Sequence, residues 1–315
     1  NESNFKNFSR GLIYSRIIKG ERMVDRTMQG VYPILSMPFD SQARIDVEDL
    51  QREVEYLIES GVHGIGLAMA SEIYKLSESE RNVAITAIVE QVNHRVKVVI
   101  NTSAPGTDTA ILYGRTAQDL GADAIMVTPP FGIHSSIIKH YYKSISKSIN
   151  LPIFIQDTDS LPLDPDLLVQ ISLESHIECY AKIEAIPTSP RIAKTKELSG
   201  DTIRIFVGGT GDNFYVEELR AGSVGIMPGA ILPEIFVRTW ELHQGGLTDN
   251  ISPQFSQYSP LLSILGQGHG ISSYLTKEVL RLKGIFKAAN ARSPALKPDQ
   301  KSYQKLAEMI EILDV

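Results

Sequence analysis

Residues 121–125, Gly121-Ala122-Asp123-Ala124-Ile125, show the pattern from which the fold can be predicted. A helical stretch ends at the glycine, two residues follow, and a small residue then opens an apolar run. The same arrangement occurs at Gly61-Val62-His63-Gly64-Ile65 and at Gly222-Ser223-Val224-Gly225-Ile226. Glycine can close a helix with a positive φ, and we expect the small residue to let strand and helix pack closely. The chain is therefore predicted to repeat one helix-to-strand unit.

Eight short apolar runs alternate with helical patterns from Gly30 onward, as buried parallel strands do. Residues 46–60 carry apolar side chains at helical spacing, and residues 77–93 open with a Ser-x-x-Glu capping box. No G-x-G-x-x-G follows the first run, which disfavours dinucleotide binding. The expected strands are 31–37, 64–70, 96–101, 124–128, 153–156, 177–182, 203–207 and 224–227.

These patterns predict an α/β fold, a (βα)₈ TIM barrel with additional C-terminal helices. We assign residues 1–29 to an N-terminal extension, 30–245 to the barrel and 246–315 to a C-terminal helical addition. The segment 1–26 is polar and basic and lacks the apolar core of a signal peptide, so we give it no catalytic role.

The composition excludes several classes of function. The chain of 315 residues has a net charge of −6 and no long basic run, which excludes a nucleic-acid footprint. No apolar run approaches the ~20 residues of a membrane span. The single cysteine, Cys179, cannot form an intrachain disulfide and fits a reducing cytoplasm. We expect a cytoplasmic protein whose partner is a small molecule.

The working residues of a barrel stand at the carboxyl ends of its strands. Lys182 ends the apolar run 177–181, and a lysine in such a place is either paired or chemically used. Apolar surroundings favour the neutral amine, which can attack a carbonyl and form a Schiff base. If the strand continues, Glu184 faces the same side and could neutralise the lysine in a salt bridge. Position alone leaves both interpretations open.

Three further segments contain motifs whose order along the chain can be compared with that of known families. Residues 31–40 read Val-Tyr-Pro-Ile-Leu-Ser-Met-Pro-Phe-Asp, residues 72–77 contain Glu-x-x-x-Leu-Ser, and residues 121–130 run from Gly-Ala-Asp-Ala to Val-Thr-Pro-Pro. Together they resemble the dihydrodipicolinate synthase and N-acetylneuraminate lyase family, over about residues 30–294. Its first strand ends in Thr-Pro-Phe, its second is followed by Glu-Ser-x-x-Leu-Ser, and its fourth carries Gly-Ala-Asp-Ala and Val-Thr-Pro.

The resemblance implies a class I aldolase, dehydratase or related lyase acting on a 2-oxo acid such as pyruvate. Lys182 falls where the family's Schiff-base lysine ends the sixth strand, and Gly208-Gly209 where a strand-seven glycine backs the substrate. It also implies a homodimer or homotetramer, with Phe131-Gly132-Ile133-His134 at the dimer interface. We expect no cofactor, and the histidines show no metal-ligand spacing, so we expect no metal.

The chain departs from the family's pattern where protons are moved. The Thr-Thr-Gly-Glu after strand two becomes Met69-Ala70-Ser71-Glu72, and the Tyr-Tyr after strand four becomes Pro130-Phe131. The strand-five Tyr-Asn, whose Tyr is the proton shuttle, becomes Gln156-Asp157, and the Arg a few residues later has no clear counterpart around residues 159–162. We expect a divergent branch that keeps Lys182 and is not an efficient dihydrodipicolinate synthase.

The expected catalytic residues are Lys182, Glu184 and Gln156. Glu184 could replace the missing Tyr as acid or base, or merely neutralise the lysine, whereas Gln156 can hydrogen-bond but cannot titrate. Glu72 is expected to be a scaffold carboxylate, and Ser71 either a carboxylate-binding hydroxyl or a turn residue. The expected substrate contacts are Ala70, Ser71, Phe131, Gly208 and Gly209.

Two other functions remain open. Residues 208–212, Gly-Gly-Thr-Gly-Asp, with Pro228-Gly229-Ala230, resemble a phosphate cradle, which would make Lys182 only an electrostatic contact. Alternatively, the lost proton-relay residues would fit a barrel that binds a ligand without catalysis.

Overall fold

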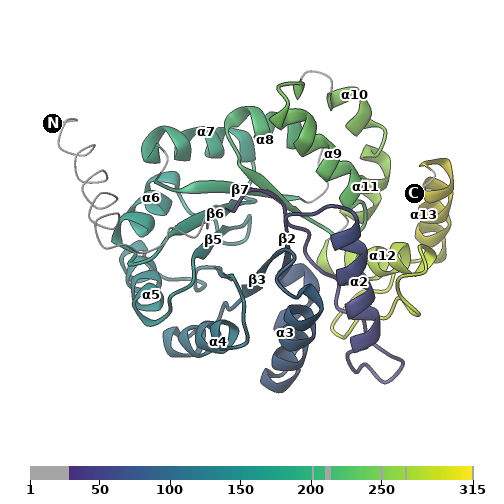
Figure 1. The fold of residues 1–315 in the computed structure, drawn as a ribbon, viewed down its shortest axis with the longest axis horizontal. Helices are drawn as coiled ribbons and strands as arrows, with labels where there is room; N and C mark the ends of the chain where they lie inside the picture. Colours follow the sequence, from purple (N-terminus) through teal and green to yellow (C-terminus); the bar gives the residue numbers. More distant parts are fainter. Residues whose placement is uncertain (1–27, 201, 210–213, 249–250, 267, 314–315) are drawn as a thin grey trace.

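The computed structural model describes residues 28–200, 202–209, 214–248, 251–266 and 268–313. Eight parallel strands form one sheet in the order β1-β8-β7-β6-β5-β4-β3-β2, which is the (βα)₈ barrel expected from the sequence (Figure 1). The strands are β1 (Gly30–Val31), β2 (Gly64–Leu67), β3 (Lys97–Asn101), β4 (Ala124–Val127), β5 (Ile153–Asp157), β6 (Cys179–Ile183), β7 (Arg204–Gly209) and β8 (Gly225–Pro228).

The barrel closes through the segment that follows β1. Ile34 bridges to Gly66 on one side and to Gly229 on the other, and Leu35 N–H donates to Gly66 O. The expected strand 31–37 is wrong in length, because the ladder ends at Val31. Pro33 has no N–H to donate, so this segment continues the barrel by single bridges rather than by a ladder.

The helices surround the sheet, and their ends follow the capping residues that the sequence shows (Figure 1). Asp46 caps α2 by accepting from Asp49 N–H, and Ser77 and Glu80 form the expected capping box of α3. The barrel helices are α2 (Val47–Glu59), α3 (Glu78–Val92), α4 (Thr107–Asp119), α5 (Ser135–Ser148), α6 (Pro165–Glu174), α7 (Thr188–Ser199), α8 (Tyr215–Ala221) and α9 (Pro233–Gln244), with the short turns η1 (Met69–Ser71) and η2 (Ile73–Lys75).

The three repeated glycines close their helices as expected, with φ of 81° at Gly61, 96° at Gly121 and 107° at Gly222. The expectation that the small residues three places later let strand and helix pack closely is wrong. A Cβ on Gly64 would lie 2.1 Å from the Tyr32 ring, and one on Gly225 would lie 2.4 Å from the Phe206 ring. These positions therefore face the barrel interior and make room for aromatic rings, not for helices.

Aromatic rings fill the barrel interior below the site. Phe154 stacks on Tyr180 with ring centroids 4.7 Å apart, and Phe206 meets the ring of Tyr32 edge-on at 5.2 Å. These rings form one buried cluster with Ile34, Met126 and Met227, separate from the layer between sheet and helices. The barrel is thus a packed core and not a channel, which leaves chemistry to its ends.

Four helices follow α9: α10 (Ile251–Ser256), α11 (Ser259–Leu265), α12 (His269–Leu282) and α13 (Gln300–Leu313). Leu261, Leu275 and Leu306 belong to the same hydrophobic cluster as the sheet-facing residues of the barrel helices. In Figure 1 these helices lie together beside α2 and α9. The C-terminal part of the chain is therefore packed onto the barrel and can contribute to its carboxyl end.

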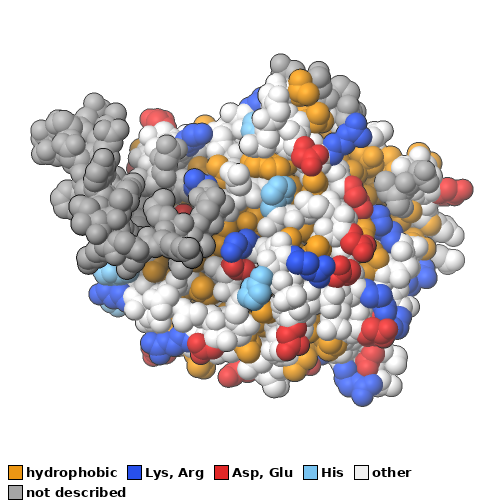
Figure 2. Space-filling view, in the orientation of Figure 1, with side chains coloured by type: hydrophobic (Ala, Val, Ile, Leu, Met, Phe, Trp, Pro, Cys, Tyr) orange, Lys and Arg blue, Asp and Glu red, His pale blue; other side chains and the backbone are white. Residues whose placement is uncertain are grey.

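The surface carries charges of both signs. Lys and Arg side chains alternate with Asp and Glu side chains over the face shown in Figure 2. Among the described helices, none is both long enough and apolar enough to cross a membrane.

Candidate active site

Lys182 stands inside the mouth of the barrel. It lies in β6 two residues after the interior Tyr180, so both side chains point inward, and it is only 4% exposed. Its Nζ lies 3.1 Å from Oε1 of Glu184, which follows the end of β6. Glu184 N–H donates to Asp157 O at 2.8 Å, which extends the β5–β6 pairing by one step. The expected same-side geometry of Lys182 and Glu184 is confirmed.

Gln156 fixes the second oxygen of the Glu184 carboxylate. Its Nε2 donates to Glu184 Oε2 at 2.6 Å, and its Oε1 accepts from Asn101 Nδ2 at 3.5 Å. Gln156 and Asn101 are both buried, at the carboxyl ends of β5 and β3. A line of hydrogen bonds thus runs from Asn101 through Gln156 and Glu184 to Lys182. Sequence reasoning missed Asn101, although the strand-end rule that selected Gln156 also selects it.

Gly208 makes room for the Glu184 side chain. A Cβ at this position would lie 1.9 Å from Glu184 Cγ and 2.2 Å from its Oε1. The glycine therefore supports the carboxylate, and its expected contact with substrate stays a prediction. Gly209 pairs with Pro228 of β8, and residues 210–212 of the expected phosphate cradle lie outside the described residues.

A cavity of about 270 Å³ opens in front of Lys182 and Glu184. Ala70 is one of its lining residues, and its expected contact with substrate stays a prediction. Much of the remaining lining comes from β8, α9 and the C-terminal helices α11 and α12, which sequence reasoning did not place near the site. The other lining residues are Ile34, Met227, Pro228, Gly229, Ile231, Phe236, Leu262, Leu265, Gly266, Gly268, Ser272 and Thr276.

A second cavity, of about 280 Å³, lies on the other side of Glu184. It runs between the start of α7 and the start of α8. Glu184 borders both cavities, so its carboxylate separates the two spaces. The other lining residues are Ile186, Pro187, Thr188, Ser189, Pro190, Gly208, Phe214, Glu217 and Glu218.

Two of the expected substrate contacts, Ser71 and Phe131, line neither cavity. Ser71 is fully buried, and its Oγ accepts from Ala68 N–H at 3.0 Å, so the turn interpretation describes it. Phe131 is 85% exposed and lines neither cavity. Its role as a substrate contact stays a prediction.

An arginine does reach the fifth strand, from a place that the sequence did not indicate. Arg191 of α7 donates to Asp157 from Nε at 3.0 Å and from Nη2 at 2.9 Å, and also to Leu163 O. Asp157 is fully buried, and burial raises its pKa despite the arginine. The pair anchors the end of β5 and so supports the neighbouring Gln156.

Glu72 is the scaffold carboxylate expected from the sequence. Its two oxygens pair with Lys75 at 2.7 Å and with the buried Lys277 of α12. Burial lowers the pKa of Lys277 to about 8. The Lys277–Glu72 pair ties α12 to the loop that carries Ala70, and so fixes one wall of the cavity against another.

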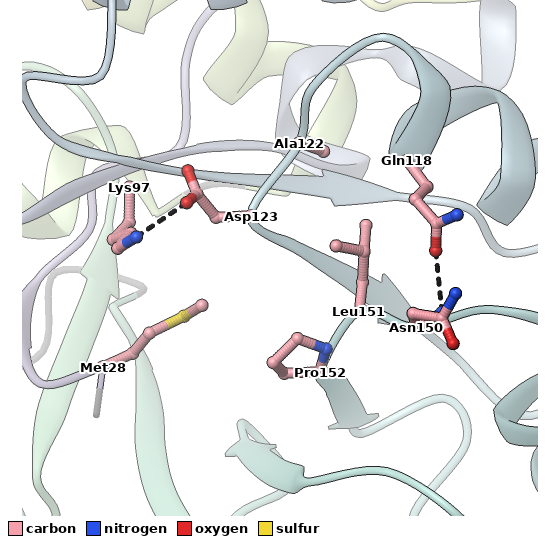
Figure 3. Close-up of a pocket in the computed structure, with 8 residues that line it drawn as sticks. All are labelled: Met28, Lys97, Gln118, Ala122, Asp123, Asn150, Leu151 and Pro152. Atoms are coloured by element: carbon pink, nitrogen blue, oxygen red, sulfur yellow. Dashed lines mark hydrogen bonds and ion pairs between the residues drawn. The ribbon is translucent and has the colours of Figure 1, made fainter. Parts of the chain in front are cut away.

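A cavity of about 420 Å³ at the opposite end of the barrel is not the site (Figure 3). Lys97 pairs with Asp123 at 2.7 Å, and Gln118 accepts from Asn150 N–H at 2.7 Å. These groups lie at the amino ends of strands and satisfy one another. In barrels that end serves stability, whereas the carboxyl end carries the chemistry.

The fold is an eight-stranded parallel barrel with a buried lysine beside a carboxylate at the carboxyl end of its strands. The chain belongs to the dihydrodipicolinate synthetase family, whose model matches residues 27–313. The members of this family are lyases of the class I aldolase and dehydratase type, and this chain is therefore an enzyme of that kind. The family resemblance drawn from the sequence is confirmed.

The relatives within the family differ in the reactions that their names give. The chain is 27% identical to an L-2-keto-3-deoxyarabonate dehydratase of Azospirillum brasilense over 284 residues, which cover 87% of this chain and 91% of that protein. It is 30% identical to a 4-hydroxy-tetrahydrodipicolinate synthase of Methanocaldococcus jannaschii over 219 residues, which cover 66% and 73%. Membership of the family therefore does not determine which reaction this chain catalyses.

Solved structures show the same fold. A dihydrodipicolinate synthase from Rhodopseudomonas palustris aligns with a TM-score of 0.85 at 23% identity, over 90% of this chain and 97% of that one. The enzyme from Aquifex aeolicus aligns with a TM-score of 0.85 at 19% identity, over 91% and 98%.

Proposed function

We propose that this enzyme is a Schiff-base-forming lyase that dehydrates or cleaves a 4-hydroxy-2-oxo acid, with Lys182 as nucleophile and Glu184 as acid and base. One observation carries the proposal: the 3.1 Å contact between Lys182 Nζ and Glu184 Oε1, two residues that both line the cavity. An ammonium group cannot attack a carbonyl, and a carboxylate at this distance can accept its proton.

The covalent step follows from this pair. Glu184 takes a proton from Lys182, and the free amine attacks C2 of the 2-oxo acid to give a carbinolamine. In the carbinolamine, one of the two protons of the amine has moved to the C2 oxygen. Glu184 then gives its proton to this hydroxyl group, which leaves as water, and the other amine proton stays on the nitrogen of the protonated imine. The protonated imine then accepts electrons from C3, so that a C3–H bond can break toward Glu184 as base.

Dehydration is the outcome that we favour. After removal of the C3 proton, Glu184 holds it next to the substrate and can deliver it to the C4 hydroxyl. The C4–O bond breaks, water leaves, and a C3=C4 double bond forms. A single carboxylate thus performs both proton transfers, as general base and general acid. The dehydratase name of the Azospirillum relative supports the same choice. Aldol cleavage is the alternative, in which Glu184 takes the C4 hydroxyl proton and the C3–C4 bond breaks.

Gln156 is a positioning residue in this proposal. It donates to Glu184 Oε2 and so leaves Oε1 free to face Lys182 and the substrate. Its own amide is oriented by Asn101. The three residues replace the Tyr-based relay that the resemblance led us to look for.

The phosphate-binding alternative has little support. The side chain of Glu184 fills the space against Gly208, so a negative charge stands at the start of the expected cradle. Pro228 and Gly229 line the cavity that holds Ile34, Met227 and Leu262. A phosphate would therefore meet a carboxylate and an apolar wall. The non-catalytic alternative is disfavoured by the Lys182–Glu184 contact itself.

Assembly and location remain part of the proposal. The exposed Phe131 and the following Gly132-Ile133 fit a homodimer, or a homotetramer built from two dimers. The lone buried Cys179 fits a cytoplasmic location.

The reaction can be tested by following products directly. The purified enzyme is incubated with 2-keto-3-deoxyarabonate and with 4-hydroxy-2-oxopentanoate, and the products are read by NMR. Loss of the C4 hydroxyl is expected, and it vanishes in the Lys182→Ala variant. Release of pyruvate and an aldehyde would establish aldol cleavage instead. Turnover that persists in Lys182→Ala would contradict the proposed function.

A further inference from the structure

The cavity in front of Lys182 has an apolar far wall. Met227 and Pro228 come from the end of β8, Ile231 from the segment before α9, Phe236 from α9 itself, and Leu262 and Leu265 from α11. Ile231, Phe236, Leu262 and Leu265 are all at most 7% exposed in the whole molecule, so they are fixed by packing. A ligand chain that extends from Lys182 into this space meets mainly carbon.

The polar groups of this wall are few. The Ser272 hydroxyl of α12 donates to Leu265 O and is thereby engaged. Thr276, one turn further along α12, contributes the other hydroxyl side chain of the far wall. Each hydroxyl of a polyhydroxylated chain placed here would need a partner, and an unmade hydrogen bond in a buried site is costly.

Among the described residues that line the two cavities, negatively charged side chains outnumber positively charged ones. Among the described residues that line the two cavities meeting at Glu184, Lys182 is the one Lys or Arg. The second cavity adds the carboxylates of Glu217 and Glu218 to that of Glu184. A second carboxylate of a substrate would therefore lie in the first cavity without a cation other than Lys182, or in the second cavity beside the carboxylates of Glu184, Glu217 and Glu218, and either place is unfavourable for it.

We propose that the substrate carries an uncharged, apolar group beyond C4, and that this group lies between β8 and the helices α11 and α12. The inference rests on the proposed Schiff base at Lys182 and adds the substrate class to it. The C-terminal helices then act as the specificity wall of the barrel, held in register by the buried Lys277–Glu72 pair. Monocarboxylic 2-oxo acids with alkyl or aryl tails are accepted, and dicarboxylic 2-oxo acids are rejected.

The test uses three acids with the same carbon chain and different ends: 2-oxohexanoate, 6-hydroxy-2-oxohexanoate and 2-oxoadipate. Each is trapped on the enzyme with borohydride, and the concentration that gives half-maximal adduct is read by intact mass, with pyruvate as reference. The methyl-ended acid is expected to saturate at a concentration at least about tenfold below that of 2-oxoadipate, a difference of about 1.4 kcal/mol. The hydroxyl-ended acid should lie between the two.

Equal or better trapping of 2-oxoadipate, or of the hydroxyl-ended acid, overturns the inference while leaving the proposed function intact. Absence of any adduct, including that of pyruvate, contradicts the proposed function and the inference together. The two failures are therefore distinguishable in one experiment.

A charge placed in the wall provides the matched variant. Thr276→Lys adds a cation where the chain end is proposed to lie and should bring the half-saturating concentration of 2-oxoadipate below that of 2-oxohexanoate. Leu282→Lys adds the same charge to the same helix at a residue that is 43% exposed and outside the cavity, and it should keep the wild-type order. If Thr276→Lys folds and 2-oxohexanoate still saturates it at a lower concentration than 2-oxoadipate, the chain end does not lie beside residue 276 and the inference is overturned. If this variant fails to fold, the half-saturating concentrations of the three acids on the wild-type enzyme still test the inference.

Discussion

Glu184 Oε1 lies 3.1 Å from Lys182 Nζ; Lys182 is in β6 and Glu184 is the first residue after that strand. The other oxygen of the carboxylate is held by Gln156 at 2.6 Å. A side chain at position 208 would occupy the space that the Glu184 side chain needs. The two interpretations that the sequence left open are compatible in the proposed mechanism, because the carboxylate that pairs with the lysine would also accept its proton.

Glu184→Gln should fold and lose turnover. The amide keeps the shape of the side chain but can neither take the C3 proton nor return it, so kcat should fall by ~10²–10⁴-fold. The measurement is steady-state kinetics on whichever 4-hydroxy-2-oxo acid the product assay identifies. Gln156→Leu is the companion variant: it should lower kcat by about tenfold with little change in KM, because it disturbs the carboxylate and not the cavity. A Glu184→Gln enzyme within a factor of about three of wild type would remove Glu184 from the mechanism.

Condensation of pyruvate with aspartate semialdehyde should be weak or absent. The resemblance aligns Met69, Phe131 and Gln156 with the family's hydroxyl-bearing relay, and none of these side chains can donate and accept a proton at working pH. A coupled assay with the two substrates measures this. A turnover number in the ordinary enzymatic range of ~1–10³ per second would show that the alignment of strands four and five is wrong.

The chain should associate, at least as a dimer, through the loop before α5. Phe131 is 85% exposed and is followed by Gly132 and Ile133, and a ring of this size on a loop is most stable when another surface covers it. Light scattering at micromolar concentration is expected to give a dimer or tetramer, and Phe131→Asp to shift it toward monomer. A wild-type protein that is monomeric throughout this range contradicts the expectation.

Stability should rise with pH in the alkaline range because of Lys277. Burial lowers its folded-state pKa to about 8 from an ordinary value of 10.5. Between these values the unfolded chain holds a proton that the folded chain has lost, so the free energy of unfolding increases with pH. Urea unfolding of wild type and Lys277→Met should show the difference between them growing from about pH 8 toward pH 10 and staying flat below. Parallel curves over the whole range would mean that Lys277 titrates normally.

The barrel could be predicted because its determinants are local. The glycines at 61, 121 and 222 adopt the positive φ expected of them, and the caps at Asp46 and Ser77 begin their helices. Lys182 and Glu184 could be paired because strand periodicity alone puts them on one side.

What the sequence did not reveal depends on contacts between distant segments. Asn101 contacts Gln156, Arg191 contacts Asp157, and Thr276 of α12 lines the same cavity as Lys182. No local pattern reports which helix will cover the mouth of a barrel. The sequence also did not show that Gly64 and Gly225 face the barrel interior, because the rings that they accommodate, Tyr32 and Phe206, come from other segments of the chain.

The central claim is that Lys182 becomes covalently attached to its substrate. The direct measurement is borohydride reduction in the presence of a panel of 2-oxo acids, followed by intact mass and peptide mapping. The account predicts one reduced adduct per chain, located on the peptide that contains Lys182. The adduct should be absent in Lys182→Ala and in Lys182→Arg, which should fold but stays protonated. Trapping at another lysine, or none with any acid of a broad panel, would contradict it.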